Sequence, residues 1–224
     1  MYYNLKCKKI FKMNSQIELA GPINQSSNST KRLVFFLHGW GSDGNDLIQI
    51  SHHWKKELEN TTFLAPNGPE LCAGNPDGKQ WFNILTEDSE KLYQGLKNSF
   101  FLLDKYIDFQ LNHYNLGKDD FFLVGFSQGT MLSLFSSIRK KCKGVIGYSG
   151  AFLDGDLPKN IVKNDILLIH GELDSVVPIT RMKHAEGKLI NMSKVLETKI
   201  YSQLEHSINQ EGLVLGCDFV KKRL

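Results

Sequence analysis

The chain has 224 residues, of which 41% are hydrophobic and 11% aromatic, and 27 basic residues against 24 acidic ones leave a formal net charge of +3. This length and composition predict one folded domain with a sizeable core and exclude a disordered chain. The near balance of charge gives no sign of a nucleic-acid-binding surface.

The N-terminal segment is basic, with four lysines between residues 6 and 12. It lacks the continuous apolar stretch and the small-residue cleavage site of a secretory signal, so we expect no export. We separate residues 1–14, an extension that could be disordered, from a single domain at residues 15–224, and Met13 could be the natural start. The lysines could make transient contact with a membrane surface, although four lysines without an amphipathic face are more typical of a solvated end.

Four cysteines are spread widely through the chain and include no C-x-x-C pair. A chain of this size does not need disulfides to support its core, so we expect free thiols in a reducing compartment and hence a cytoplasmic location. The absence of any run of about twenty apolar residues predicts that no segment spans a membrane.

Short apolar runs alternate with longer helical patterns along the rest of the chain. In order, we expect a strand at 33–38, a helix at 47–58, a strand at 62–66, a glycine- and proline-rich loop to residue 81, a long helix at 92–111, a strand at 121–124 followed by a helix, strands at 144–149 and 165–170, a helix at 179–191, a strand at 196–201 and a helix at 208–223. This alternation predicts an α/β fold with a mostly parallel central sheet and helices on both faces. In such folds the site lies at the carboxyl ends of the strands.

Residues 124–129, Val-Gly-Phe-Ser-Gln-Gly, join an expected strand to an expected helix. The spacing is that of a nucleophile elbow, in which Gly125 and Gly129 permit a turn too tight for a Cβ and Ser127 is pushed outward. The start of the following helix would favour negative charge beside Ser127. An ordinary glycine-rich turn is the alternative, and the apolar strand before and the amphipathic helix after favour the elbow.

Two loops after later strands offer partners for this serine. Residues 171–178 contain Glu172 and Asp174, and residues 203–206 end in His206. The order Ser, Asp, His matches the α/β-hydrolase arrangement, so we assign Asp174 as the carboxylate that orients the imidazole and His206 as the general base. For Glu172 we favour a solvated surface charge, and Asp174 could instead cap the helix that begins near residue 178.

The first strand ends in a glycine-rich loop, residues 38–44. It lacks the Lys-Ser/Thr ending of a phosphate-binding loop and the full spacing of a dinucleotide fingerprint. In a hydrolase of this kind the loop donates one backbone NH to an oxyanion, and the residue after the nucleophile donates the other. We therefore name Trp40 and Gln128 as the oxyanion hole.

His38 and His170 each end a strand and could be mistaken for metal ligands. No carboxylate or cysteine spacing completes a zinc set around them, so we interpret them as packing and hydrogen-bonding residues. We expect neither a metal nor an organic cofactor.

Several segments in a fixed order resemble the phospholipase/carboxylesterase family of α/β hydrolases, which includes acyl-protein thioesterases and bacterial carboxylesterases. The matching segments are LHGWGSDGND at 37–46, APNGPE at 65–70, WFNI at 81–84, GFSQG at 125–129, HGELDSVVP at 170–178 and EHS at 205–207. The resemblance implies a compact hydrolase without a large lid domain or cofactor that cleaves carboxylic esters or thioesters of acyl chains.

The chain departs from the family pattern at Trp40, where a smaller apolar residue is common, at Thr130, where a third glycine is common, and over residues 151–163. Trp40 and the loop from Leu71 to Trp81 are candidates for the wall of a substrate pocket. Within that region we name Leu71, Trp81 and Phe82 as pocket residues, although Trp81 and Phe82 could equally belong to the core.

These patterns predict a serine hydrolase that cleaves carboxylic esters through an acyl-enzyme, of the carboxylesterase, lysophospholipase or acyl thioesterase type. A peptidase or a lactonase would use the same triad. A non-catalytic module that binds lipid or protein on a hydrolase scaffold is the alternative from another class, because a fold alone does not determine function.

Overall fold

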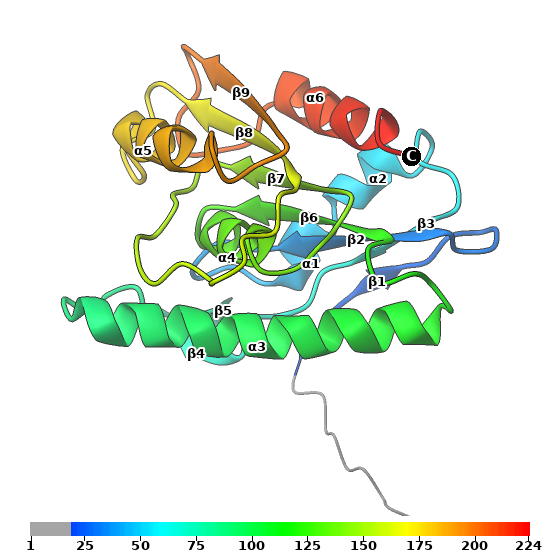
Figure 1. The fold of residues 1–224 in the computed structure, drawn as a ribbon, viewed down its shortest axis with the longest axis horizontal. Coiled ribbons are helices and arrows are strands. Elements are labelled where there is room, and N and C mark those ends of the chain that lie inside the picture. Colours follow the sequence, from blue (N-terminus) through cyan, green and yellow to red (C-terminus); the bar gives the residue numbers. More distant parts are fainter. Residues whose placement is uncertain (1–18) are drawn as a thin grey trace, which may run out of the picture.

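A seven-stranded sheet forms the centre of the computed structural model, which describes residues 19–224 (Figure 1). The strands lie in the order β1-β3-β2-β6-β7-β8-β9 and comprise β1 Ile23–Asn24, β2 Arg32–Leu37, β3 Thr61–Leu64, β6 Phe121–Phe126, β7 Gly144–Tyr148, β8 Asp165–Gly171 and β9 Val195–Tyr201. Strand β1 pairs antiparallel with β3, and each of the other pairs is parallel, which confirms the expected mostly parallel sheet. The extension expected at residues 1–14 lies outside the described residues.

Helices cover both faces of the sheet, as expected (Figure 1). One core lies beneath α3 Ser89–His113, α4 Gln128–Ser137 and α5 Ile179–Leu189, and the other beneath α1 Gly44–Leu47, α2 Ile50–Trp54 and α6 Gln210–Lys221. Strand β2 shows how the two cores are built, because Phe35 belongs to the first and Phe36 to the second. Successive side chains of a strand point to opposite faces, so a central strand covered on both sides is apolar throughout.

The helix expected at residues 47–58 is wrong in extent, since the structure has the short helices α1 and α2 instead. Asp43 caps α1 by accepting hydrogen bonds from the backbone NH groups of the next turn. The sequence of α2, Ile-Ser-His-His-Trp, consists of residues with low helix propensity, which explains why no long helix forms. A hydrogen bond from the indole Nε1 of Trp54 to the Leu213 carbonyl, 3.0 Å long, holds this segment against α6.

The loop expected before residue 81 contains a hairpin of β4 Glu70–Cys72 and β5 Asn75–Gln80. Its glycine and proline content conceals the strand pattern in the sequence. The hairpin is attached to the glycine-rich loop at residues 38–44, because the backbone of Lys79 pairs with Gly41 and Ser42. It therefore lies beside the expected oxyanion loop.

Within residues 19–224, none of the helices combines the length and the apolar character needed to cross a bilayer.

Candidate active site

Ser127 lies at the junction of β6 and α4 in a backbone conformation that non-glycine residues rarely adopt, with φ 52° and ψ −112°. Two glycines make the turn possible. A Cβ at Gly129 would lie 1.8 Å from the carbonyl oxygen of Leu37, and one at Gly125 would lie 2.4 Å from the backbone of Gly129. Such strain persists only where the surrounding structure enforces it, and it is typical of functional sites.

Thr130, a departure from the family pattern, has a matching space in β7 and the loop after it. A Cβ at Gly150 would lie 2.3 Å from the Cβ of Thr130, so a glycine there accommodates the larger side chain. The Thr130 hydroxyl lies 2.8 Å from the carbonyl oxygens of both Gly125 and Tyr148, between which its proton is shared. The threonine thus joins the elbow to the neighbouring strand.

Asp174 and His206 are brought together from the loops after β8 and β9. Oδ2 of Asp174 accepts a 2.8 Å hydrogen bond from Nδ1 of His206. Oδ1 accepts bonds of 2.9 and 2.8 Å from the backbone NH groups of Val176 and Val177, so the carboxylate is fixed within its own turn. Asp174 is only 5% exposed.

Asp174 does not cap helix α5, which was the alternative for this residue. Helix α5 begins after Pro178 and has no side-chain cap. Asp174 binds NH groups that precede the helix, so its carboxylate serves the loop and His206 instead.

His206 lies over the elbow. Its ring centroid is 4.9 Å from that of Phe126, the residue before Ser127, and the Ser149 hydroxyl donates a 3.4 Å bond to the carbonyl of Ser207. Nδ1 is occupied by Asp174, which leaves Nε2 to face a reacting group. No hydrogen bond joins the Ser127 hydroxyl to His206 in the described part of the chain. Catalytic bonds of this kind are often long or poorly aligned before substrate binds.

The backbone NH groups of Trp40 and Gln128 make no hydrogen bond to any other described residue. The Gln128 NH is at the first position of α4, where helices leave NH groups without an internal partner. These two groups are therefore available to an anion beside Ser127.

The side chain of Gln128 has a structural role that its position in the sequence does not reveal. Its Oε1 accepts a 2.9 Å bond from the backbone NH of Trp81, and its Nε2 donates a 2.7 Å bond to the carbonyl of Phe82. Gln128 thereby holds the segment after β5 against the elbow. A contact between positions 47 residues apart leaves no local pattern in a sequence.

The expected pocket residues differ in their environments. Trp81 and Phe82 are fully buried and belong to the core, which was the alternative for them, rather than to the surface of a pocket. Leu71 is 67% exposed on the hairpin. Trp40 donates a 2.9 Å hydrogen bond from its indole Nε1 to Oε1 of Gln80, so its side chain is anchored to the same hairpin.

His170 lies directly against the carboxylate of Asp174. Its Nε2 donates a 2.7 Å hydrogen bond to the carbonyl of Val177 and lies 3.3 Å from Oδ2 of Asp174. The ring is 1% exposed. The predicted hydrogen-bonding role is confirmed, and the structure adds that the bond closes the turn that carries Asp174.

His38 shapes the loop that contains Trp40. Its Nδ1 lies 2.8 Å from the Gly39 carbonyl, and its Nε2 accepts a 2.8 Å bond from the NH of Gly68, so the ring is neutral. Burial lowers the pKa of His38, and this effect exceeds the opposite influence of the Gly39 carbonyl and the carboxylates of Asp43 and Asp46.

Protonation of His38 should therefore destabilise the fold. Because its pKa is lowered from an ordinary value of 6.5, the stabilisation is complete above about pH 6.5 and is lost as the pH falls through the lowered pKa. We expect His38→Gln, whose amide oxygen can still accept from Gly68, to reduce the pH dependence of the unfolding free energy by up to about 1.4 kcal/mol per pH unit. Urea unfolding of the wild type and the variant between about pH 5 and about pH 8 measures this pH dependence. Identical slopes for the two proteins would contradict this assignment.

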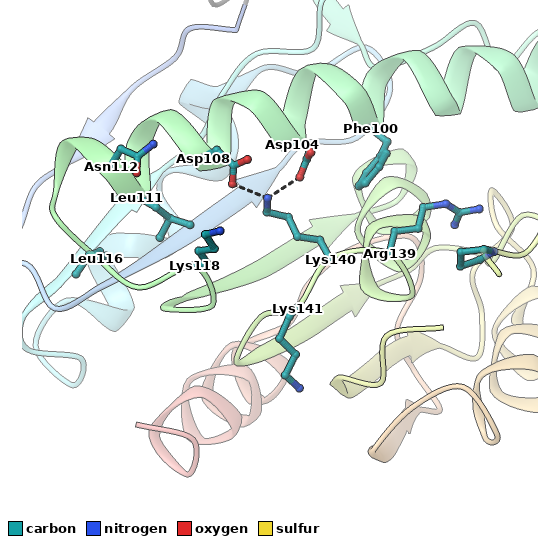
Figure 2. A pocket seen from close by; sticks show the side chains of 11 residues that line it. Phe100, Asp104, Asp108, Leu111, Asn112, Leu116, Lys118, Arg139, Lys140 and Lys141 are labelled. Carbon is teal, nitrogen blue, oxygen red and sulfur yellow. Dashed lines mark hydrogen bonds and ion pairs between the residues drawn. The ribbon is translucent and has the colours of Figure 1, made fainter. Parts of the chain in front are cut away.

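A cavity of about 730 Å³ lies away from these residues, between α3 and the turn after α4 (Figure 2). Lys140 points between Asp104 and Asp108 of α3, with its Nζ 2.6 Å from a carboxylate oxygen of each. The lysine and the two carboxylates bind one another, and no predicted site residue lines the cavity. Its size alone therefore does not make it the site.

The family model for phospholipases and carboxylesterases matches residues 21–224. The chain belongs to the phospholipase/carboxylesterase family. It is an ester hydrolase with the α/β-hydrolase architecture, as the resemblance of its motifs predicted, and residues 19–224 contain no large lid domain.

Relatives of the chain align with it over most of its length. Acyl-protein thioesterase 1 of Saccharomyces cerevisiae is 28% identical over 213 residues, which cover 87% of this chain and 93% of the relative. Esterase YpfH of Escherichia coli is 24% identical over 206 residues, which cover 89% of this chain and 86% of the relative. The crystal structure of esterase PE8 is 36% identical, with a TM-score of 0.82, and the match covers 92% of this chain and 99% of that one.

Proposed function

We propose that the chain cleaves carboxylic esters or acyl thioesters through a Ser127-His206-Asp174 triad and an acyl-enzyme. The observation that carries the proposal is the 2.8 Å hydrogen bond between the buried Asp174 and His206, at the strand ends where Ser127 occupies a strained elbow. A hydrogen bond of this geometry orients the neutral imidazole, and the carboxylate stabilises the positive charge that forms on the ring during the reaction.

The first half of the reaction forms the acyl-enzyme. The Ser127 oxygen attacks the substrate carbonyl carbon while its proton passes to Nε2 of His206. The carbonyl oxygen becomes an oxyanion that accepts hydrogen bonds from the NH groups of Trp40 and Gln128. The bond to the alcohol or thiol then breaks, and His206 returns the proton to that leaving group.

The second half releases the acid. Water gives a proton to His206 and attacks the acyl-enzyme carbonyl, and the collapse of the second tetrahedral intermediate returns the proton to Ser127. The two halves share the oxyanion hole, and the net change is hydrolysis of one ester or thioester bond.

Esters and thioesters are the substrate classes that the relatives support, since one is named an acyl-protein thioesterase and another an esterase. We place the reaction in the cytoplasm, because the three described cysteines, Cys72, Cys142 and Cys217, are free thiols.

Labelling with a fluorophosphonate probe tests the triad, because only an activated serine reacts quickly with such a reagent. We expect one label per chain, located on Ser127 by peptide fragmentation and absent after heat unfolding. Ser207, an exposed serine next to His206, is the matched control and should stay unlabelled. A label on Ser207, or no label on the native protein, would reject the proposed triad.

A further inference from the structure

A hollow of about 370 Å³ lies against His206 on the side of the sheet covered by α1, α2 and α6. Its apolar wall consists of Leu47, Ile50, Phe126, Ile208 and Leu213. These side chains come from α1, α2, the elbow and the start of α6, segments that adjoin one another in the fold. The volume falls within the range of about 300 to 1,000 Å³ that is typical of small-molecule sites.

The triad chemistry determines which part of a substrate must end beside this hollow. Asp174 occupies Nδ1 of His206, so the proton for the leaving group comes from Nε2. The carbonyl oxygen is directed to the NH groups of Trp40 and Gln128. The alcohol or thiol therefore leaves on the side of His206, whose ring and following residues line the hollow.

We infer that the hollow is a leaving-group pocket, which binds the apolar part of the alcohol or thiol that the enzyme releases. The inference rests on the proposed function and adds a substrate class to it, namely esters whose specificity lies partly in an apolar leaving group. Phe126 links the two sites, since it lines the hollow and contacts the His206 ring.

A second cavity of about 280 Å³ extends the leaving-group pocket. It shares His53 and Leu213 with the first cavity, and its lining includes Trp54 of α2 and Val214 of α6. Val214 is 51% exposed on this path. The combined groove suits an extended chain rather than a compact group.

The charged residues of the groove are of one sign. Asp46 lines the first cavity, Glu57 and Asp218 line the second, and no lysine or arginine within residues 19–224 lines either. Glu57 is paired with Lys221, 2.6 Å away, so the negative charge of the groove comes from Asp46 and Asp218. The groove should therefore accept a neutral or cationic leaving group better than an anionic one.

Butyrate esters with different alcohols test the pocket, because the acyl-enzyme is then the same for every substrate. Leu213→Trp should fill the pocket and lower kcat/KM about tenfold for the hexyl ester, with less than about twofold change for the methyl ester. Hydrolysis of the shared acyl-enzyme should be unchanged. Leu213→Ala enlarges the pocket and should lower kcat/KM for the hexyl ester less than Leu213→Trp does, and Ile200→Trp, at an exposed residue on β9 outside both cavities, is the control for a surface tryptophan.

Three results would overturn the leaving-group pocket. The first is a loss of kcat/KM in Leu213→Trp that is equal for the methyl and hexyl esters. The second is a loss of hexyl ester kcat/KM in Leu213→Ala as large as that in Leu213→Trp. Either result would indicate a structural effect of the substitution rather than a filled pocket. The third is a loss that follows the length of the acid in methyl esters, which would assign the hollow to the acyl chain.

The charge prediction has its own test in wild-type protein. A hexyl butyrate whose hexyl chain ends in an ammonium group should be cleaved faster than one whose hexyl chain ends in a carboxylate. The opposite order would contradict the acidic groove. Failure of the proposed function can be distinguished from failure of the leaving-group pocket. If the proposed triad is wrong, Ser127→Ala retains turnover. If only the pocket is wrong, turnover still depends on Ser127.

Discussion

Ser127→Ala should lower kcat/KM for a butyrate ester by about 10⁴-fold or more, because the variant has no atom that can form the acyl-enzyme. Alanine keeps the Cβ and therefore the same strained backbone, so the fold and its stability should change little. Initial rates and circular dichroism on the same preparation measure the two quantities. Turnover close to that of wild type would contradict the assignment of the nucleophile.

Ser127→Gly separates catalysis from backbone strain. It should be as inactive as the alanine variant, but glycine adopts φ near 52° without the cost that other residues bear. Relief of such strain is expected to increase the unfolding free energy by about 1–3 kcal/mol relative to Ser127→Ala. Equal stability of the two variants would show that the conformation at residue 127 stores little strain.

Asp174→Asn should lower kcat by about 10⁴-fold while the fold remains intact. The NH groups of Val176 and Val177 require an acceptor at the Oδ1 position, so the amide oxygen must take that place. The new NH₂ group then points to Nδ1 of His206, which must become the acceptor. The ring proton moves to Nε2, and the imidazole can no longer accept the proton of Ser127.

Glu172→Gln provides the matched control, because Glu172 is an acid in the same loop and its side chain is exposed. We expect its kcat and kcat/KM to stay within about twofold of wild type, as for a surface charge outside the site. Comparable losses in Glu172→Gln and Asp174→Asn would mean that the loop as a whole, and not the carboxylate of Asp174, supports the reaction.

The hairpin β4–β5 illustrates what local patterns cannot reveal. Its strands are short and largely exposed, and β5 contains both proline and glycine, so neither alternation nor apolar content distinguishes them from a loop. The backbone bonds of Lys79 to Gly41 and Ser42 hold the hairpin in place, and these bonds join segments that are far apart in the chain. The same limit applies to α2, where a contact with α6 substitutes for helix propensity.

By itself, the sequence determined the α/β architecture, the strand-turn-helix junction at Ser127 and the order of the three expected triad residues. Each of these depends on periodicity, on glycine spacing or on the position of a residue just after a strand, which are local properties of the chain.

Only the tertiary structure decided which groups meet. It joined Asp174 to His206 across 32 positions, placed the Gln128 amide against Trp81, removed Trp81 and Phe82 from the pocket surface and opened an apolar hollow beside His206. These features depend on distances between residues remote in sequence and on the space that side chains from different elements leave unfilled. Packing of the whole sheet and its helices sets both quantities, and no segment of the chain encodes either one alone.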